Sequence, residues 1–333
     1  MSDFDPTDVL FVGWGTAEGV SHYRTILPAR TMGAEWVIIG MDGKPVCGEG
    51  SKKHHQVIVV QNCWNDWQLK VVERMKKTGS KVVFNVDDWI KAIGRREGSH
   101  GHAQMFRSRK LNEIHERIWS TCDGAIVSTE WIAKKAIGLT EEIHIARNGV
   151  DPGRYTPWMD VERDMGIIIG WAGGTGHRDA LRSISNGIST IVKEHSNVSL
   201  WIVGQDESDL FSCNTHYVDW SDMYLYPQHL ACFDINLAPA LENDFYRGKS
   251  QLRLYEAWTL GTPTVASPLY DEINDGFDGL LAWGPGDFYT QVLKLVQSPK
   301  LRENIRNESL RSAEGVTIDA RINEWRDAVG AFC

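Results

Sequence analysis

Three charged side chains in the segment 245–263 have the types and spacing needed to hold a phosphorylated ligand. The pattern predicts a loop followed by about three turns of helix, with Ser250 as the N-cap. At roughly 100° per residue, Lys249, Arg253 and Glu256 fall within roughly 60° of one another around the helix axis. Two cations at a helix start favour an anion such as a diphosphate, and a carboxylate accepts hydrogen bonds from two ribose hydroxyls. A surface helix with an i,i+3 ion pair shows the same pattern.

A second candidate is the pair of adjacent carboxylates, Asp87 and Asp88, which directly follows a predicted strand at residues 81–86. Carboxylates at a strand end suit metal binding or proton transfer, and they also suit the capping of a following helix. No third ligand at a readable spacing accompanies the two close histidine pairs, His54-His55 and His100-x-His102. We therefore predict no metal site.

Two glycine-rich turns each follow a predicted strand and open a predicted helix. The first, at residues 13–19, nearly matches a dinucleotide-binding fingerprint, but its third glycine lies at the wrong spacing. The second lies within residues 170–181. Small residues in such turns let the backbone approach a ligand, although a tight turn that needs only the positive φ of glycine has the same composition.

Short apolar runs alternate with helical patterns along the whole chain. We predict strands at residues 8–13, 35–40, 56–61, 81–86, 124–128, 143–146, 166–171, 198–203, 233–237, 262–266 and 279–282. We predict helices at residues 19–33, 64–78, 107–120, 129–137, 177–194, 224–231, 250–259, 286–297 and 316–331. This alternation predicts an α/β protein with parallel sheets and helices on both faces of each sheet.

The length of 333 residues exceeds one ordinary core and suits two domains of roughly 150 residues each. We place one domain at residues 1–150 and the other at 151–315, with the junction within 148–164. No apolar run reaches the ~18–20 residues that span a bilayer, and the acidic start lacks a signal core. The six cysteines are scattered, which is typical of reduced thiols, so we expect a cytoplasmic protein.

The net charge of −9 conceals one basic segment. Between positions 91 and 110 the chain has a single acidic residue, Glu97, and six basic ones: Lys91, Arg95, Arg96, Arg107, Arg109 and Lys110. Such a segment is either a solvated face or a surface that meets a polyanion.

The segment 248–267 resembles the donor-site helix of GT-B glycosyltransferases, and in particular the retaining glycosyltransferase-4-type family. The matching residues are Lys249-Ser250-x-x-Arg253-x-x-Glu256-Ala257 and Gly261-Thr262-Pro263-Thr264-Val265-Ala266-Ser267. Glu256 corresponds to the second of two family glutamates, the one that holds the nucleotide ribose. The first glutamate is absent, because Gly248 stands at its position, so the sugar contact has no assigned residue.

The resemblance implies the GT-B fold, in which two Rossmann-like domains face each other across a cleft and a C-terminal helix, here 316–331, packs back on the first domain. The second glycine-rich turn resembles the loop that holds the donor diphosphate. The residues thereby implied to bind the donor are Gly15, Gly173, Gly174, Thr175, His177, Gln205, Ser250 and Glu256. The first loop is similar to one that faces the cleft and approaches a donor phosphate or an acceptor, which implicates His22 and Arg24 as acceptor-side residues.

The implied reaction moves a sugar from a UDP- or GDP-sugar to an acceptor hydroxyl, with retention and without a metal or other cofactor. Lys249 and Arg253 would stabilise the departing diphosphate. Asp87 and Asp88 would orient or deprotonate the acceptor hydroxyl.

The sequence is compatible with more than one kind of acceptor. A glycan or a small molecule is one, and hydroxymethylated bases in bacteriophage DNA are another, with Arg95 and Arg96 on the DNA phosphates and the host cytoplasm as the location. A third hypothesis is a non-catalytic protein that binds a nucleotide sugar or a nucleic acid on a GT-B scaffold. The sequence predicts no oligomeric state.

Overall fold

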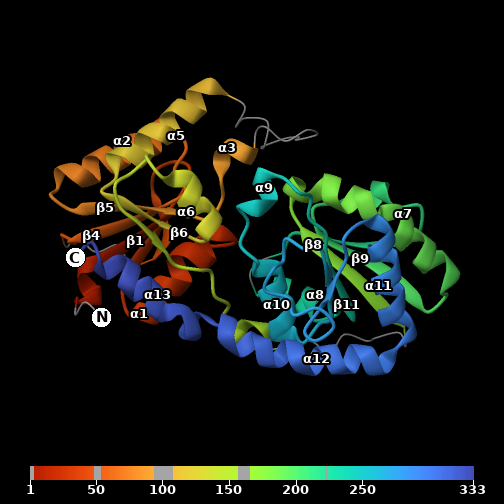
Figure 1. Ribbon diagram of the computed structural model, residues 1–333. Helices are drawn as coiled ribbons and strands as arrows, with labels where there is room; N and C mark the ends of the chain where they lie inside the picture. Colours follow the sequence, from red (N-terminus) through yellow and green to blue (C-terminus); the bar gives the residue numbers. More distant parts are fainter. Residues whose placement is uncertain (1–3, 49–53, 94–107, 157–165, 222–223) are drawn as a thin grey trace. The chain divides into compact units, whose positions relative to one another are not determined.

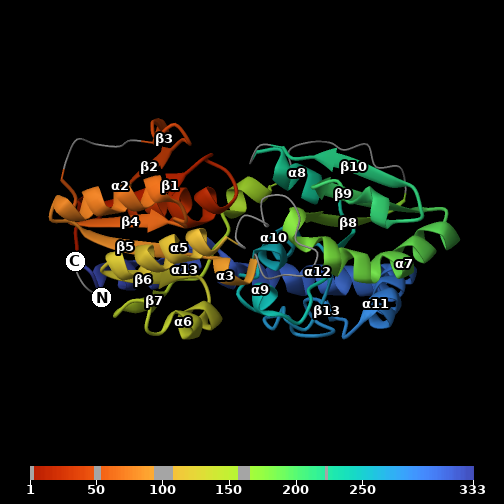
Figure 2. The same ribbon diagram turned by 90° about the horizontal axis from the view of Figure 1, so that it is seen from above.

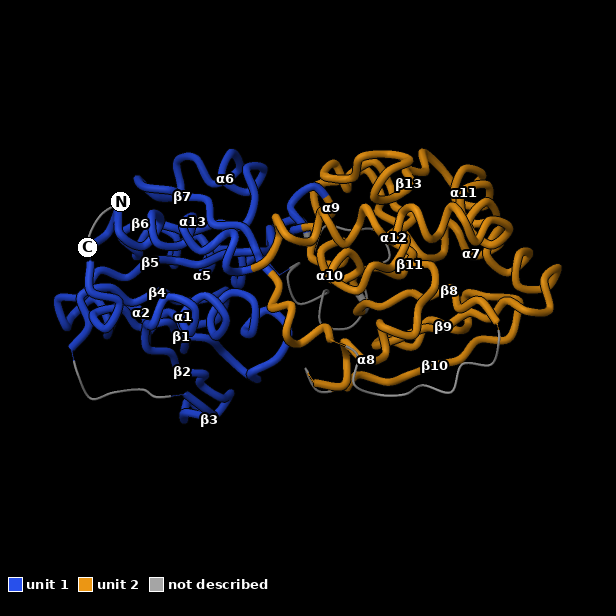
Figure 3. Tube along the Cα trace, turned by 90° about the horizontal axis from the view of Figure 1, so that it is seen from below, with its two compact units in different colours: residues 1–149, 247–250, 318–333 blue, residues 150–246, 251–317 orange. Residues whose placement is uncertain are grey.

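The structure is a computed structural model that describes residues 4–48, 54–93, 108–156, 166–221 and 224–333. The chain forms two units, which Figure 3 colours separately. Unit 1 comprises residues 1–149, 247–250 and 318–333. Unit 2 comprises residues 150–246 and 251–317. The C-terminal helix is thus part of unit 1, as is a short insertion of residues 247–250.

Unit 1 is built on a seven-stranded sheet with the order β3-β2-β1-β4-β5-β6-β7. Its strands are β1 (Val9–Trp14), β2 (Glu35–Ile39), β3 (Pro45–Gly48), β4 (Val57–Gln61), β5 (Lys81–Val86), β6 (Gly124–Val127) and β7 (Ile143–Ile145). All neighbours run parallel except β3, which is antiparallel to β2. Because the strand order reverses between β1 and β4, the carboxyl ends of these strands mark the place where such sheets bind ligands.

Helices cover both faces of this sheet (Figure 1): α2 and α5 lie on one face, and α1 and α13 on the other. The helices of unit 1 are α1 (Leu27–Met32), α2 (Asp66–Lys77), α3 (Ile90–Ile93), α5 (Arg109–Thr121), α6 (Glu130–Ala136) and α13 (Ile318–Gly330). A capping box between Asn65 and Gln68 starts α2, since each side chain bonds the other's backbone N–H. The core between the sheet and α5 contains the fully buried Ile118 and Trp119.

Unit 2 has a six-stranded sheet with the order β10-β9-β8-β11-β12-β13, and all its neighbours are parallel. Its strands are β8 (Ile167–Gly173), β9 (Val198–Gly204), β10 (Thr215–Asp219), β11 (Ile235–Ala238), β12 (Thr264–Ala266) and β13 (Leu280–Leu281). The order reverses between β8 and β11, so the ligand-binding edge of this unit is expected at the carboxyl ends of these two strands.

The helices of unit 2 are α7 (Arg178–Glu194), α8 (Tyr226–Leu230), α9 (Asp244–Arg247, whose last residue falls in unit 1), α10 (Leu252–Leu260), α11 (Pro285–Gln297) and α12 (Pro299–Ala313). Figures 1 and 2 show α7 and α11 on one side of the sheet, with α8 and α10 on the other. Ile184 and Ile188 of α7 and Phe288 of α11 are buried in the core of this side.

The predicted alternation of strands and helices is confirmed, because every predicted strand corresponds to a strand of one of the two sheets. The sequence pattern missed the strands β3 and β10, the one-turn helices α3 and α9, and the helix α12. Both strands lie at a sheet edge and are largely exposed, so they lack a buried apolar run. Within the ranges described, no helix combines the length and hydrophobicity needed to cross a membrane.

Candidate functional site

The glycine-rich turn of unit 2 lies where the strand order reverses. β8 ends at Gly173, and a short 3-10 helix, η4 (Thr175–His177), leads directly into the 17 residues of α7. The N–H groups at the start of α7 have no acceptors within the helix, so this end favours an anion. His177, the residue before α7, packs its ring against Phe245 and Tyr246. The turn has the composition and position of a phosphate-binding loop, and the roles of Gly173, Gly174, Thr175 and His177 in binding a phosphate stay predictions.

Arg253 of α10 lies directly over this turn. Its guanidinium carbon is 5.7 Å from the centre of the Trp171 ring, and a Cβ built on Gly173 would come within 2.7 Å of Nη2. A side chain at position 173 would therefore displace the guanidinium or the Trp171 ring. Nη1 of Arg253 and the indole Nε1 of Trp171 are both buried without a hydrogen-bond partner among the described residues.

Two unsatisfied buried donors at one place indicate a missing acceptor. An unpaired buried N–H group costs about 1–3 kcal/mol, and more if it carries charge, so proteins rarely keep one without a function. One of the two donors is a cation, and both lie at the carboxyl end of β8 beside the glycine turn. An anion with several oxygens, such as a diphosphate, satisfies this arrangement.

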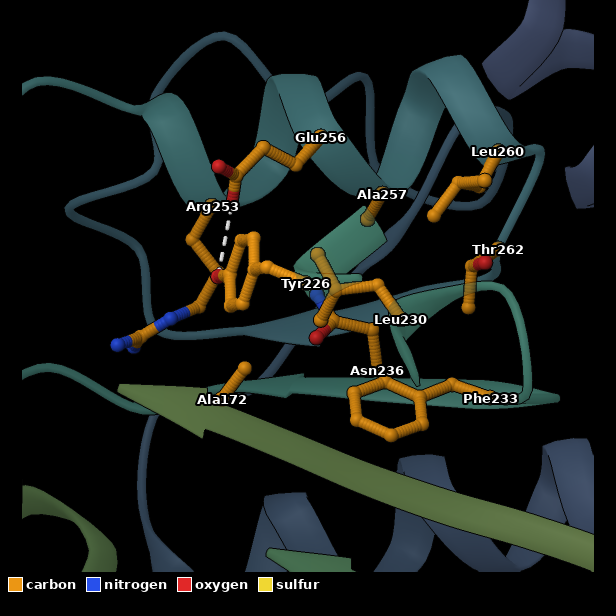
Figure 4. A pocket seen from close by; sticks show the side chains of 10 residues that line it. All are labelled: Ala172, Tyr226, Leu230, Phe233, Asn236, Arg253, Glu256, Ala257, Leu260 and Thr262. Carbon is orange, nitrogen blue, oxygen red and sulfur yellow. Dashed lines mark hydrogen bonds between the residues drawn. The ribbon is translucent and has the colours of Figure 1, made fainter. Parts of the chain in front are cut away.

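Glu256 of α10 lines a small pocket next to Arg253 (Figure 4). Its carboxylate accepts a hydrogen bond from the hydroxyl of Tyr155 at 2.9 Å and another from that of Tyr226 at 3.3 Å. Burial and the negative charge of Glu256 raise the pKa of Tyr226 well above its usual range, so this hydroxyl stays a donor. Glu256 thus lies among hydroxyl donors, which is the chemistry that a ribose would also offer.

Gln205 follows β9, and its backbone N–H bonds the carbonyl of Gly173 at 2.9 Å. Its side-chain nitrogen lies 3.5 Å from the carbonyl of Asp206 and is exposed. The strand end is thus fixed beside the glycine turn, whereas the Gln205 side chain lies against its own chain.

Arg178, the first residue of α7, is a second basic residue beside the turn. Its guanidinium instead pairs with Glu207 and with Asp209, so its charge is already neutralised by two carboxylates.

The predicted helix start at Ser250 is wrong, because α10 begins at Leu252 with Gln251 before it and no side-chain cap. Lys249 therefore does not share a helical stripe with Arg253 and Glu256. It belongs to unit 1, where its Nζ lies 2.6 Å from Oδ1 of Asp88. The side chain of Ser250 also lies in unit 1, where it accepts a hydrogen bond from Asn148 at 2.9 Å. The physical reason is that residues 247–250 are anchored to unit 1.

Gly248, which replaces the first family glutamate, lies in the same insertion and is buried. A Cβ at this position would stand 3.3 Å from the Trp131 ring and 3.3 Å from Cβ of Trp89. These two indoles pack edge to face, with ring centres 6.3 Å apart. Indole rings therefore occupy the space that a glutamate side chain would need.

Asp87 and Asp88 follow β5 in unit 1 and differ in their environments. Asp88 pairs with Lys249, whereas Asp87 is buried and accepts a hydrogen bond from Nδ2 of Asn62 at 2.7 Å. Burial, together with the charge of Asp88, raises the pKa of Asp87 to about 6, against the lowering effects of Arg24, Lys249 and Asn62. A carboxyl with this pKa changes its charge just below neutral pH.

Asn62 is a residue that the sequence analysis missed. It follows β4 and has a φ of +32°, the only positive φ among the described residues other than glycine. It is 7% exposed, and its Oδ1 is buried without a hydrogen-bond partner in the part of the chain that the structure describes. A strained backbone and an unsatisfied acceptor beside an acid are typical of functional sites. Only the fold brings it next to Asp87.

The residues after the first glycine turn take structural positions. Arg24 is fully buried, and its N–H groups donate to Asn85, to the carbonyl of Ala146 and to Asn148, while Trp325 stacks 4.3 Å away. Burial lowers its pKa to about 10, so it remains charged at neutral pH. Since its donors are occupied by the protein, the prediction that Arg24 contacts the acceptor is wrong.

His22 starts a π-helix (His22–Ile26) and is buried, and its ring packs edge to face on Tyr23. Gly15 follows β1 with a φ of +84°, and a Cβ there would meet no atom within 4 Å. The loop at Gly15 is therefore open toward its surroundings, and its conformation explains the glycine.

Arg95 and Arg96 lie outside the described residues. The described basic side chains of the segment 91–110 all have acidic partners: Lys91 with Glu116, Arg109 with Glu113, and Lys110 with Asp66. In the described ranges, no group of three or more His, Cys, Asp or Glu side chains has the arrangement of a metal site.

Unit 2 is similar in sequence to a known protein family. Residues 166–298, all within unit 2, match the family model described as Glycosyl transferases group 1. The chain carries a glycosyltransferase domain. No curated protein shows significant sequence similarity to the chain.

Solved structures show the fold of the whole glycosyltransferase. Sucrose-phosphate synthase from Thermosynechococcus elongatus superimposes with a TM-score of 0.67 at 11% identity, over 96% of this chain and 97% of the other. A glycosyltransferase from Rickettsia africae gives 0.65 at 11% identity, over 97% and 98%. The pneumococcal O-GlcNAc transferase GtfA, solved with UDP and GlcNAc, gives 0.57 at 16% identity, over 89% and 66%. The predicted GT-B fold of two Rossmann-like domains is thereby confirmed.

Proposed function

We propose that this glycosyltransferase moves a sugar from a nucleotide-diphosphate sugar to an acceptor hydroxyl, with retention and without a metal. The observation that supports the donor most strongly is the pair of buried, unsatisfied donors, Arg253 Nη1 and Trp171 Nε1, at the carboxyl end of β8. They lie beside a glycine turn and a helix start, and all of these groups favour the same anion.

In this proposal Arg253 stabilises the leaving group. The bond between the anomeric carbon and the diphosphate oxygen breaks while the bond to the acceptor oxygen forms, so negative charge grows on the diphosphate. Arg253, Trp171 and the glycine turn at residues 173–175 then bind that charge more strongly than they bind the intact donor. In the retaining reaction the departing oxygen takes the proton of the acceptor hydroxyl.

Glu256 is proposed to bind the nucleotide ribose. Its carboxylate already accepts hydrogen bonds from two tyrosine hydroxyls, at 2.9 Å and 3.3 Å, and the longer of these, from Tyr226, is the easier to replace. We propose a donor of the UDP or GDP type, and the structural neighbour solved with UDP and GlcNAc supports this choice.

Asp87 and Asn62 are proposed to position the acceptor. The amide N–H of Asn62 is occupied by Asp87, so its Oδ1 and the Asp87 carboxylate both remain hydrogen-bond acceptors. Such a pair suits a hydroxyl group, which donates, and disfavours a phosphate, which is an anion at the same position. A glycan or a small polyol therefore fits this place.

Hydroxymethylated DNA is the alternative acceptor. The described cations of the segment 91–110 are each paired with a carboxylate, so they give this alternative no support. The remaining alternative is a non-catalytic binding protein, and a measurement of turnover distinguishes it from an enzyme. Binding of a nucleotide sugar without hydrolysis or transfer on any acceptor would favour the binding protein.

The proposed donor site is tested by calorimetric titration of the full chain with UDP, GDP and inorganic pyrophosphate. We expect all three to bind, and Arg253→Gln to weaken each about 10- to 100-fold because a charged hydrogen bond is lost. Lys300→Gln, which removes an exposed cation of α12 in the same unit, serves as the control and should change nothing. If pyrophosphate and both nucleotides fail to bind, the proposal is overturned.

A further inference from the structure

An exposed indole stands beside the proposed phosphate site of unit 2. Trp220 directly follows β10, and its side chain is 55% exposed. A single exposed aromatic side chain implies no binding role by itself, so the surroundings of Trp220 decide the question. Trp220 lies against two glycines, Gly174 and Gly204, which stand at the ends of β8 and β9.

One edge of the Trp220 ring rests on backbone. A Cβ built on Gly204, at the end of β9, would come within 3.0 Å of Cζ2 of Trp220, and one built on Gly174 would come within 3.7 Å of the same atom. Gly204 also has a φ of +99°, which favours glycine. The two glycines therefore let an edge of the indole lie against the ends of β8 and β9, while the side chain stays 55% exposed.

This position is close to Arg253. The guanidinium of Arg253 lies over Gly173, and Trp220 lies against the next residue, Gly174. A cationic group and an aromatic ring at two consecutive residues match the two chemical parts of a nucleotide, its anionic phosphate and its flat base. Tyr226 also lies near Trp220, with the two ring centres 6.3 Å apart, and its hydroxyl donates a hydrogen bond to Glu256.

We propose that Trp220 is the stacking platform for the nucleobase of the donor and that it accepts different bases. This inference rests on the proposed nucleotide-sugar function and deepens it. A ring face attracts any base by stacking, whereas discrimination requires hydrogen bonds to the base edge. Gln205, the described side chain placed to read an edge, lies against the backbone of Asp206 instead. The site therefore selects a nucleoside diphosphate as a class and discriminates weakly between uracil, guanine and adenine.

The experiment is a titration of UDP, GDP, ADP and inorganic pyrophosphate against the full chain and three variants. Wild-type protein should bind the three nucleotides with dissociation constants within about tenfold of one another, because stacking tolerates every base. Trp220→Ala should weaken all three nucleotides about 5- to 100-fold and leave pyrophosphate unchanged. Trp220→Phe should retain most of the affinity, since it keeps an aromatic face.

Trp283→Ala is the matched control. Trp283 is 78% exposed and follows β13, at the opposite edge of the same sheet, so its removal should leave all four dissociation constants unchanged. The melting temperature of each unliganded variant shows whether it is folded. Nucleotide binding that Trp220→Ala does not alter, or a loss confined to one base, overturns the proposal while the proposed donor site stands. Failure of wild-type protein to bind any of the four ligands overturns both.

Discussion

The side-chain amide of Asn62 donates a hydrogen bond to Oδ1 of Asp87 across 2.7 Å, and the two residues stand at the ends of the neighbouring strands β4 and β5. Each keeps the other in place: the carboxylate orients the amide, and the amide stabilises the carboxylate. The pKa of Asp87 is nevertheless raised to about 6, so burial and Asp88 outweigh the hydrogen bond. The ionisation of Asp87 is therefore a property of this pair and its surroundings.

The transfer rate should depend on pH through this carboxyl. If ionised Asp87 orients the acceptor, kcat/KM rises with pH through about 6, the raised pKa of Asp87. Asn62→Ala removes a hydrogen bond that stabilises the carboxylate, so the rising limb should move to higher pH. Steady-state rates between pH 4.5 and 8 measure both effects. The same limb in Asp87→Asn would show that another group titrates.

The same group predicts how stability varies with pH. The folded protein binds the Asp87 proton more tightly than the unfolded chain, because the pKa is raised from 3.8 to about 6. The free energy of unfolding should therefore decrease as pH rises between these values, and Asp87→Asn should remove that decrease. We expect Asp87→Asn to be about 2–3 kcal/mol more stable than wild type at pH 7, with little difference at pH 3.5.

Urea unfolding at several pH values measures this difference. Glu113→Gln is the control, because Glu113 is an exposed carboxylate on α5 of the same unit. An Asp87→Asn variant that is less stable than wild type at neutral pH would contradict the prediction.

Glu256 should contribute to nucleotide affinity through the ribose. Glu256→Gln is expected to weaken UDP about tenfold, because a charged hydrogen-bond acceptor is lost, and to affect 2′-deoxy-UDP less. Tyr226→Phe should not weaken UDP, since its hydroxyl competes with the ribose for Oε2. Titration of the two nucleotides against both variants measures the coupling. Equal losses for UDP and 2′-deoxy-UDP would exclude a contact with the 2′-hydroxyl.

Arg24 should stabilise unit 1 and make no contact with substrate. Arg24→Met leaves buried acceptors on Asn85, Asn148 and Ala146 without donors, so we expect a loss of about 3–5 kcal/mol in the free energy of unfolding. Arg24→Lys should lose less, because it keeps the charge but not the planar set of donors. Chemical denaturation measures both. An Arg24→Met protein with unchanged stability and a raised KM for the acceptor would restore the sequence-based interpretation.

Replacing Gly248 by the glutamate of the family should destabilise the protein. Gly248→Ala brings a methyl group to 3.3 Å from Trp131 and Trp89, which should cost about 1 kcal/mol. Gly248→Glu places a carboxylate between two half-buried indoles and should cost more than the methyl group does. Melting temperatures and donor hydrolysis rates check both variants. A more active Gly248→Glu enzyme would show that this position still reaches the sugar.

Much of the architecture is predictable because buried parallel strands consist of short runs of consecutive apolar residues. The segments at 56–61 and 81–86 show this, since each became a central strand within a residue of its predicted bounds. The edge strand β10 and the helix α12 escaped the pattern, because their exposed residues carry no continuous apolar signal. The glycine turn at 173–177 was also predictable, since a strand, glycines and a helix start are adjacent in sequence.

The sequence by itself determined the two sheets, the glycine turn, and the choice of Arg253 and Glu256 as candidates, because these features depend on short-range pattern. Only the tertiary structure decided that Lys249 leaves the helix for Asp88, that Arg24 is buried among acceptors, and that Asn62 meets Asp87. Such pairings join residues 25 to 161 positions apart, as 62 to 87 and 88 to 249 show. Burial and partner choice are properties of the packed chain, and no local pattern encodes them.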